Sequence, residues 1–493
     1  MSADASHDQI PDQAGDPPNH PAPNSIFSKR QRALIVAIVS VAATFSGFAS
    51  NIYFPSIPTI AAELSVSNEL VDLTVTSYMI FQGLSPTVWG AIADVHGRRI
   101  TYICTFVIFF GACIGLAETR HYHQLLILRC LQSTGSASTV AIGAGVLSDI
   151  TTREERGGYM GMFQAGLLIP LAIGPTIGGA LSQNVSWKAI FWFLAIYSGA
   201  FLIILIYFLP ETLPLLVSNR SLRPNSLLAT ILSSIRDRRL RVNCKMATEV
   251  VAASSSNNRS DLDLLSPLRI LFGMEVTFAI VFLSIYYTVW QMTITAMSTL
   301  FNRTYGLSEM QIGLVFIANG VGCIIGTLTT GKLLDIDYRR NKDRYTGSPE
   351  FFPLESARLR TVWLWSGLQC ASTLVFGWTV DQEVHIALPI ICTFIVGWAA
   401  TSSQSVVTTF LVDVFPKRSS SASAALNLAR CLLGAGGTAT VLPIINAITV
   451  GWTFTVLTGV MLMALGLVLL QMSYGATRRR LREKREADSE SGS

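Results

Sequence analysis

The sequence predicts an all-α polytopic membrane protein with twelve transmembrane helices in two six-helix pseudo-repeats. Half of the 493 residues are hydrophobic and 14% are charged, and the mean hydropathy is +0.46. Long stretches such as 33–62 and 386–412 contain no Asp, Glu, Lys or Arg, and about 20 apolar residues suffice to cross a bilayer as a helix. Because lipid cannot hydrogen-bond to the backbone, only helices or closed barrels span it, and these stretches are far too long for barrel strands.

The expected spans divide six and six around one long polar segment. They are placed at 33–53, 71–92, 101–118, 124–148, 157–181, 190–209, 274–299, 311–334, 361–380, 386–412, 420–446 and 452–474. The predicted organisation is a disordered cytoplasmic tail at 1–32, an N-terminal six-helix half at 33–210, a cytoplasmic linker at 211–272, a C-terminal six-helix half at 273–475 and a cytoplasmic tail at 476–493.

Positive charge predicts which side each loop faces, because Lys and Arg concentrate in cytoplasmic loops. With a cytoplasmic N-terminus, the outer loops contain Arg120, Lys188 and Arg303, while the tails, the linker and the inner loops hold nearly all the others. Both termini are therefore predicted to be cytoplasmic, and the basic balance gives no indication of nucleic-acid binding. Asn184 and Asn302 begin sequons in predicted outer loops and are candidate glycosylation sites.

A charged motif is repeated at the same place in both halves. WGAIADVHGRR follows the second span, and GKLLDIDYRR follows the eighth. Each has a glycine, an aspartate four residues later and paired arginines four residues beyond. The residues concerned are Gly90, Asp94, Gly97, Arg98 and Arg99 in the first copy and Gly331, Asp335, Arg339 and Arg340 in the second. A second repeat consists of the similar segments LSDITTREERGG at 147–158 and LVDVFPKRSSSA at 411–422. Two repeated segments at corresponding positions of the two halves indicate parallel repeats, an arrangement typical of transporters.

The repeated motif suggests a switchable contact at the inner face. An aspartate at a helix end accepts hydrogen bonds from arginines or from a neighbouring helix N-terminus. Such contacts would hold the two halves together while the inner face is closed and would break when it opens. The glycine that begins each copy is expected to let helices approach closely.

These motifs resemble those of the major facilitator superfamily, and the resemblance covers nearly the whole chain. G-x-x-x-D-x-x-G-R-R after span two looks like the loop motif of that family, and RCLQSTGSAS at 129–138 is similar to another of its motifs. IGPTIGG in span five resembles the motif of its antiporters, carried here by Gly174, Pro175, Gly178 and Gly179. The second loop copy departs from the pattern, because Asp337 and Tyr338 stand where the first has Gly97. Its turn is expected to be less tight.

Finer features resemble one branch of that superfamily. SNIYFP at 50–55, YGLSEMQIG at 305–313, NGVGC at 319–323 and ARCLLGAGG at 429–437 look like the fungal twelve-span drug:proton antiporters, most of all the branch that includes citrate exporters. The resemblance implies alternating access, proton coupling and a pathway lined by the first and fourth helices of each half.

Candidate pathway residues are the polar and aromatic side chains inside spans. An arginine in a span costs about 2.5–3.5 kcal/mol on insertion scales, so it is expected to face a cavity or a partner. The candidates are Arg129, Gln132, Tyr287, Trp290, Gln291, Gln404 and Arg430. Arg430 lies near mid-depth, whereas Arg129 lies nearer the outer end, where solvation is expected. The alternatives are a structural partner for each arginine, and lipid or interhelical packing for the aromatic and polar side chains.

The proton-carrying group is harder to find in the sequence. Glu275 begins span seven at the inner face and Asp72 begins span two at the outer face, and neither lies at mid-depth. Both stay weak candidates for a group that alternates between protonated and ionised forms.

The expected function is secondary active export of a small molecule, which is a drug, a secondary metabolite or an organic acid, by proton-coupled antiport. We expect a monomer in the fungal plasma membrane, with no cofactor, no metal and no enzymatic activity. The alternatives are an organic-anion facilitator without proton coupling and, with less support, an integral-membrane enzyme. The two arginines within spans favour an anionic substrate.

Overall fold

The computed structural model describes residues 29–151, 156–212, 266–273, 276–344, 354–415 and 419–475. All secondary structure in these ranges is helical. Most of the predicted tails, most of the predicted linker and Glu275 lie outside the described residues.

Each predicted span corresponds to one long helix. In the N-terminal half these are α1 (Lys29–Asn51), α3 (Asn68–His96), α4 (Arg98–Ala117), α5 (Tyr122–Ile150), α6 (Arg156–Asn184) and α7 (Trp187–Phe208). In the C-terminal half they are α12 (Thr277–Tyr305), α13 (Glu309–Arg344), α15 (Val362–Asp381), α16 (Ala387–Val414), α17 (Ser419–Ile448) and α18 (Val450–Leu470). Helix α1 begins four residues before the span predicted at 33–53.

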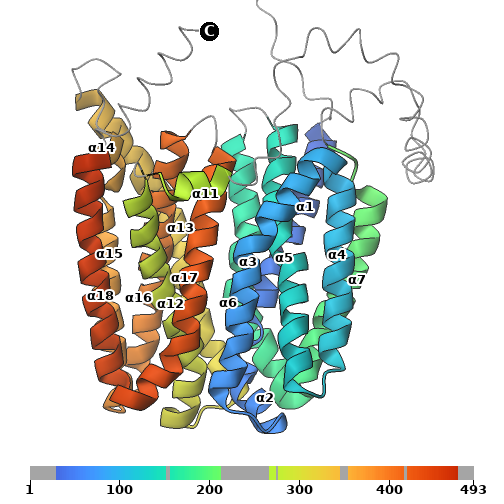
Figure 1. Ribbon diagram of the computed structural model, residues 1–493, viewed down its shortest axis with the longest axis vertical. Coiled ribbons are helices and arrows are strands. Elements are labelled where there is room, and N and C mark those ends of the chain that lie inside the picture. Colours follow the sequence, from blue (N-terminus) through green and yellow to red (C-terminus); the bar gives the residue numbers. More distant parts are fainter. Residues whose placement is uncertain are drawn as a thin grey trace, which may run out of the picture.

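Among the described residues, ten segments are long and apolar enough to cross a membrane. They include all the long helices except α3 and α15. Figure 1 shows both of these helices running the length of the bundle beside the others. Their polar residues face neighbouring helices, as the buried Thr74 of α3 and Gln369 of α15 illustrate. The helices thus complete the two sets of six.

Four short elements were not expected from hydropathy. They are η1 (Phe54–Ser56), α2 (Ile57–Glu63), α11 (Ser266–Leu271) and α14 (Leu354–Leu359). Each is too short to show an apolar period. In Figure 1, α11 and α14 lie at the end of the bundle where α1 begins and α18 ends, and α2 lies at the other end. We call these the terminal end and the opposite end.

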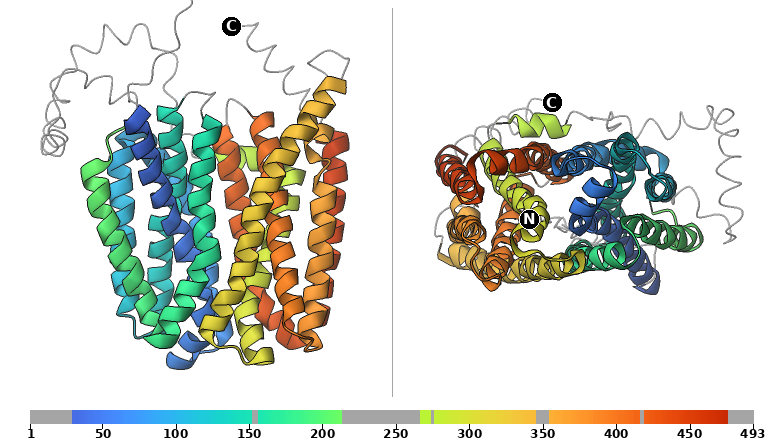
Figure 2. Two further views of the ribbon diagram at one scale, coloured as in Figure 1. Left: turned by 180° about the vertical axis from the view of Figure 1, so that it is seen from behind. Right: turned by 90° about the horizontal axis from the view of Figure 1, so that it is seen from below.

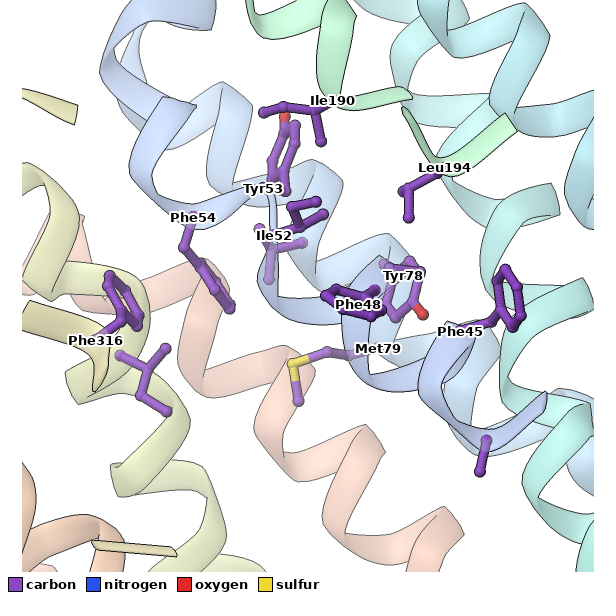
Figure 3. Packing of buried hydrophobic residues seen from close by; sticks show 14 of the residues in the cluster. Phe45, Phe48, Ile52, Tyr53, Phe54, Tyr78, Met79, Ile190, Leu194 and Phe316 are labelled. Carbon is purple, nitrogen blue, oxygen red and sulfur yellow. The ribbon is translucent and has the colours of Figure 1, made fainter. Parts of the chain in front are cut away.

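The two halves stand side by side (Figure 2). One hydrophobic core fills the N-terminal half and continues into the C-terminal half, and a second core lies within the C-terminal half. In the N-terminal half, Phe45 stacks on Tyr197 at 4.2 Å between ring centroids and meets Phe106 edge-to-face at 5.0 Å. Figure 3 shows this core continuing through Tyr53 and Tyr78 towards Phe54, whose ring stacks on Phe316 of α13 at 5.9 Å. Aromatic packing therefore joins the two halves near the opposite end.

Helices α6 and α13 form one seam between the halves, and main-chain atoms make much of it. A Cβ atom at Gly179 would overlap the carbonyl oxygen of Glu309, and one at Gly320 would overlap the backbone of Ala172. Thr176 adds a hydrogen bond from Oγ1 to the carbonyl oxygen of Gly313 (2.9 Å). Such close approach is possible because these positions lack side chains.

Helices α3 and α17 form a second seam, in which side chains make the hydrogen bonds. Asn446 Nδ2 donates to Glu69 Oε1 (2.8 Å) at the opposite end. Near the middle of the helices, Asn427 Nδ2 donates to the carbonyl oxygen of Gln82 (3.2 Å). The contacts of both seams thus run from the opposite end to mid-depth.

Candidate functional site

Arg129 is enclosed in the N-terminal half. Its side chain is 0% exposed, and Nη1 donates to the carbonyl oxygen of Ala49 (2.9 Å) and to Gln132 Oε1 (2.7 Å). The guanidinium lies over the rings of Tyr53 (4.6 Å) and Tyr78 (4.5 Å). These cation–π contacts and hydrogen bonds hold the charge without a described carboxylate partner. The expected solvation of Arg129 is wrong, because α1, α3 and α5 enclose it although it lies near a helix end.

Gln132 belongs to the same enclosed group. Its amide oxygen accepts from Arg129, and its amide nitrogen donates to Cys113 Sγ at 3.4 Å. Both polar ends of this amide are therefore occupied by protein atoms. This geometry favours a positioning role for Gln132 over direct contact with a substrate.

Arg430 has a different environment. It lies about 11 residues into α17 and is half-buried. Nε and Nη2 both donate to Asn427 Oδ1, at 3.2 and 2.9 Å, and the guanidinium lies 4.9 Å from the centre of the Tyr287 ring. No carboxylate in the described ranges forms an ion pair with Arg430. One terminal nitrogen therefore keeps donors for another group.

Aromatic and amide side chains of α12 flank Arg430. Tyr287 packs edge-to-face on Trp290 at 5.7 Å between ring centroids. The indole N–H of Trp290 is buried and has no hydrogen-bond partner. Gln291, on the same face, contacts Met79 Sδ of α3 at 3.8 Å through Nε2. Gln404, half-buried on α16, forms no hydrogen bond with a described residue and stays a separate candidate.

This cluster of Tyr287, Trp290, Gln291, Asn427 and Arg430, which we call the Arg430 cluster, adjoins the seam between α3 and α17. Asn427 holds Arg430 with its oxygen and contacts α3 with its nitrogen. A movement of one half against the other would therefore change the surroundings of the guanidinium.

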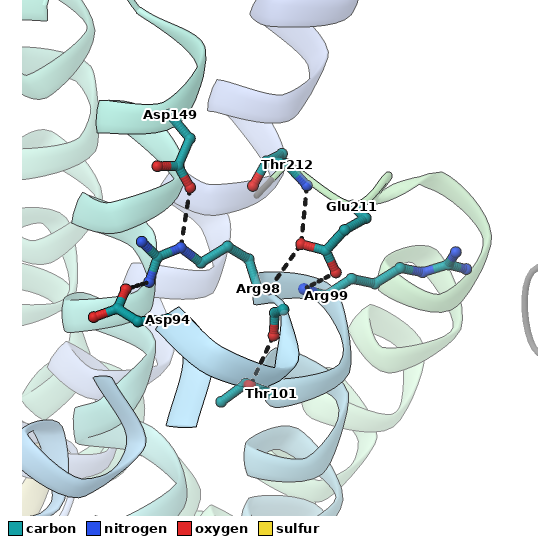
Figure 4. A network of polar contacts seen from close by, with 8 residues as sticks. Asp94, Arg98, Arg99, Thr101, Asp149, Glu211 and Thr212 are labelled. Atoms are coloured by element: carbon teal, nitrogen blue, oxygen red, sulfur yellow. Dashed lines mark hydrogen bonds and ion pairs between the residues drawn. The ribbon is translucent and has the colours of Figure 1, made fainter. Parts of the chain in front are cut away.

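The first copy of the charged motif forms a network within the N-terminal half (Figure 4). Arg98 pairs with Asp94 (Nη1–Oδ1, 2.5 Å) and with Asp149 (Nε–Oδ2, 3.0 Å). Glu211 accepts the backbone N–H groups of Arg98 (2.8 Å) and Arg99 (3.3 Å) at the start of α4, where the helix dipole favours a carboxylate. Both segments that have a counterpart in the other half thus meet in one network, because Asp149 belongs to the segment at 147–158. A contact of this motif with the other half stays a prediction.

The glycines of this motif differ in their roles. Gly97 has φ 102° and ψ 148° between α3 and α4, a conformation that L-residues rarely adopt. It therefore permits the turn that places Arg98 near Asp94. The expectation that the first glycine lets helices approach is wrong for both copies, because a Cβ at Gly90 or Gly331 would meet no atom within 4 Å.

The second copy of the motif lies inside a helix. Helix α13 continues to Arg344 through the whole motif, so the loop expected there is absent from this stretch. The side chains of Asp335 and Arg339 lie outside the described set, and Arg340 is exposed. Arg358 of α14 instead pairs with Asp413 (Nε–Oδ2, 2.7 Å).

Asp413 in the segment at 411–422 corresponds to Asp149 in the segment at 147–158. In each half a described arginine therefore forms an ion pair with this aspartate. The sequence did not single out Arg358, Glu211 or Asn427. Arg358 comes from a segment outside the motif, and no local pattern marks it. Asn427 could have been found as the residue one turn before Arg430.

The antiporter-like motif on α6 makes close helix contacts. A Cβ at Gly178 would overlap the carbonyl oxygen of Ile52 on α1, and Gly179 faces α13 as described above. Gly174 is less constrained, since a Cβ there would lie 3.4 Å from Phe48. The carbonyl oxygen of Pro175 lies against Gly313. This motif therefore connects α1, α6 and α13.

The two candidate glycosylation residues lie at the opposite end. Asn184 ends α6 and Asn302 lies in the last turn of α12, and both are exposed. Their amide nitrogens donate to the carbonyl oxygens of Ala180 (2.8 Å) and Leu307 (3.2 Å). Modification of either residue stays a prediction.

Comparison with known sequences is consistent with this architecture. Residues 39–438 match the family described as Major Facilitator Superfamily. Citrate exporter 1 of Aspergillus niger is 36% identical over 480 residues, which cover 94% of this chain and 90% of that protein. The MFS antiporter QDR2 of Candida albicans is 34% identical over 447 residues, with 89% and 87% covered.

Solved structures agree in fold. The xylose transporter XylE from E. coli, in a partially occluded inward-open conformation, has a TM-score of 0.64 at 15% identity, with 90% of this chain and 98% of that chain covered. The human organic anion transporter MFSD10 has a TM-score of 0.56 at 16% identity, with 90% and 100% covered. With two sets of six helices and a family match across most of its length, the chain belongs to the Major Facilitator Superfamily, and it is a multi-pass membrane transporter and not an enzyme.

Proposed function

We propose that this transporter exports an organic acid by alternating access in exchange for protons, and that Arg430 binds the acid. The observation that carries the proposal is a half-buried guanidinium at mid-depth, beside the seam between the halves, without a described carboxylate partner. Membrane proteins rarely keep such a charge inside a span unless it has a function. The name of the citrate exporter from Aspergillus niger supports the same substrate class.

The chemistry of the Arg430 cluster suits a carboxylate. Asn427 Oδ1 holds two of the guanidinium nitrogens, which fixes the plane of the group and leaves donors at Nη1. An arginine fork recognises carboxylates through parallel hydrogen bonds. The unpartnered indole N–H of Trp290 is a further donor on the same side of α12 as Tyr287. An acid bound here satisfies donors that are otherwise costly to bury.

A second candidate substrate class is the larger, less polar drug or metabolite. The ring faces of Tyr287 and Trp290 favour it, because aromatic side chains supply much of the contact area in small-molecule sites. The name of the antiporter from Candida albicans fits this class. The two candidates differ in the charge of the substrate and therefore in their need for Arg430.

The proposed orientation follows the positive-inside rule. The terminal end, with the tails and most of the basic residues, faces the cytoplasm, and the opposite end faces the outside of the plasma membrane. Because the contacts between the halves run from the opposite end to mid-depth, this conformation would receive substrate from the cytoplasm. A single chain contains both halves, so the proposed unit is a monomer.

The experiment is transport into proteoliposomes that contain the purified protein. Radiolabelled citrate, a dicarboxylate and a neutral drug are compared with and without a pH gradient. We expect gradient-driven accumulation of an acid and a loss of apparent affinity of about 10- to 100-fold in Arg430→Gln, since a hydrogen bond to a charged group contributes about 1.5–3 kcal/mol. The exposed Arg120 provides the matched control, because Arg120→Gln also removes one positive charge.

Two results would contradict the proposal. Equal loss of acidic and neutral substrates in Arg430→Gln would show that the arginine maintains the fold of the pathway. Acid flux that is unchanged by a protonophore, with the substrate gradient held fixed, would indicate a facilitator without proton coupling.

A further inference from the structure

Asp72 is a buried carboxylic acid without a partner. It lies in the second turn of α3, near the opposite end, and its side chain is 1% exposed. Neither carboxylate oxygen accepts a hydrogen bond in the described structure. An ionised carboxylate in such surroundings lacks both water and a compensating donor, and a group in that position neutralises instead. The geometry of this conformation therefore favours the neutral acid at Asp72.

Asp72 also lies on the face of α3 that meets the other half. Glu69, Asp72 and Thr76 follow one another at spacings of three and four residues, which places them on one face of a helix. Glu69 accepts a hydrogen bond from Asn446 of α17 (2.8 Å), and the hydroxyl of Thr76 lies 3.1 Å from that of Thr438. Asp72 stands between these two contacts. Separation of α3 from α17 at this end would expose it to water.

The charged and titratable groups nearby do not neutralise Asp72. On α5, Arg129 is 4.6 Å from the ring of Tyr53, and Tyr53 in turn donates to or accepts from Thr74 (3.0 Å). On α2, Glu63 pairs with Lys188 (3.5 Å). Other groups on the elements around this part of α3 are Glu69 on α3 itself, Cys113 on α4 and Tyr122 at the start of α5. Arg303 of α12 is the cation of this seam, and its Nη1 donates to Asn446 Oδ1 (3.3 Å) and not to Asp72. Residues 438–446 of α17 include no titratable side chain.

We propose that Asp72 is a proton-binding site of the transport cycle, occupied when the opposite end is closed and emptied when that end opens. The inference rests on the proposed alternating access and names a residue that makes the closing of this end depend on pH. Because the proton is taken from and returned to the same face, this site sets the balance between the open and closed forms and is separate from the group that carries protons across the membrane. The step is a simple acid–base reaction. On closing, one carboxylate oxygen forms an O–H bond with a proton from water at the opposite face, and on opening it returns that proton.

The sign of the pH effect follows from linkage. If closing binds one proton, a higher proton concentration at the opposite face favours the closed form, and alkaline pH favours the open form. A side chain that cannot ionise removes this dependence. Asn at position 72 has nearly the same shape as the neutral acid, so Asp72→Asn is expected to fold and to remain closed at all pH values.

The experiment measures the separation of the halves directly. Spin labels are placed at Val185 and Ile448, both exposed at the opposite end on different halves, in a cysteine-free background. Distances are recorded in lipid nanodiscs from acidic to mildly alkaline pH. We expect the wild-type distribution to shift from short to long as the pH rises and the Asp72→Asn distribution to stay short.

Glu69→Gln is the matched control. Glu69 is a half-buried carboxylate one turn away on the same seam, and its replacement should leave the pH-dependent shift in place. A pH shift that persists in Asp72→Asn, or that disappears in Glu69→Gln alone, would overturn the assignment. A wild-type protein without any pH-dependent shift would overturn it as well.

This measurement is independent of the substrate. If no organic acid is transported but the distances still depend on Asp72, the proposed substrate fails and the proton site stands. If acid export is driven by a pH gradient in Asp72→Asn as in the wild type, the proton site fails and the proposed function stands.

Discussion

Arg129 and Arg430 begin the same tripeptide, Arg-Cys-Leu, yet the fold gives the two side chains opposite surroundings. Arg129 is fully enclosed, with two tyrosine rings and two hydrogen-bond acceptors around it. Arg430 is half-buried and has one ring and one amide oxygen. The difference lies in access: Nε and Nη2 of Arg129 also lack a hydrogen-bond partner among the described residues, but they are buried, whereas Arg430 is partly exposed and can meet a substrate.

The substitution Arg129→Gln is expected to have the largest effect on the protein. Arg129→Gln removes the donor to the buried Ala49 carbonyl and to Gln132 Oε1, and an acceptor left unsatisfied costs about 1–3 kcal/mol. We therefore expect a lower melting temperature in detergent and less protein in the membrane. Acidic and neutral substrates should lose transport in parallel. A normally stable Arg129→Gln protein with a selective loss of acid transport would indicate that Arg129, and not Arg430, binds the acid.

Arg98 extends the comparison to an arginine held by carboxylates. Asp94→Asn combined with Arg98→Ala removes both ion pairs of Arg98 at the terminal end. Delivery to the membrane is measured separately, because the side chains of Arg98 and Asp149 are only 10% and 13% exposed and the loss of a buried ion pair lowers stability. Transport should fall strongly, since the network fixes the α3–α4 turn near the surface where the halves move. Surface labelling and initial export rates measure the two effects, and normal export would refute the gating role.

A smaller effect is expected from a charge-preserving change at Arg430. Arg430→Lys keeps a positive charge but loses the planar fork and the shared contact with Asn427. Apparent affinity for the acid should fall by about tenfold, as for the loss of one hydrogen bond to a charged group, while the protein level stays constant. Concentration-dependent uptake provides the measurement. Wild-type affinity in this variant would mean that the substrate recognises charge alone.

The sequence predicted the long helices and the correspondence between the two halves well, because the signals for both are local. Apolar length marks a span, and the repeated motif marks the relation between the halves. The turn at Gly97 was also predictable, since glycine stands where the second copy has Tyr338 and where α13 instead continues as a helix.

The environment of individual side chains was less predictable, because it depends on neighbours that are distant in the sequence. Arg129 seemed accessible from its depth alone, yet Tyr53, in the turn after α1, and Tyr78 of α3 cover it. Gly90 seemed to be a packing position but faces open space. The partner of Asp413 is Arg358, from a short helix that has no apolar period.

The seam between α6 and α13 has a consequence for how this protein could acquire new cargoes. Gly179, Gly313 and Gly320 meet carbonyl and Cα atoms of the other half, so closure there depends on the shape of the main chain. The side chains of the Arg430 cluster lie on other helices. Mutations that alter recognition can therefore accumulate without disturbing the seam between α6 and α13, and closure at this seam can serve chemically unrelated molecules.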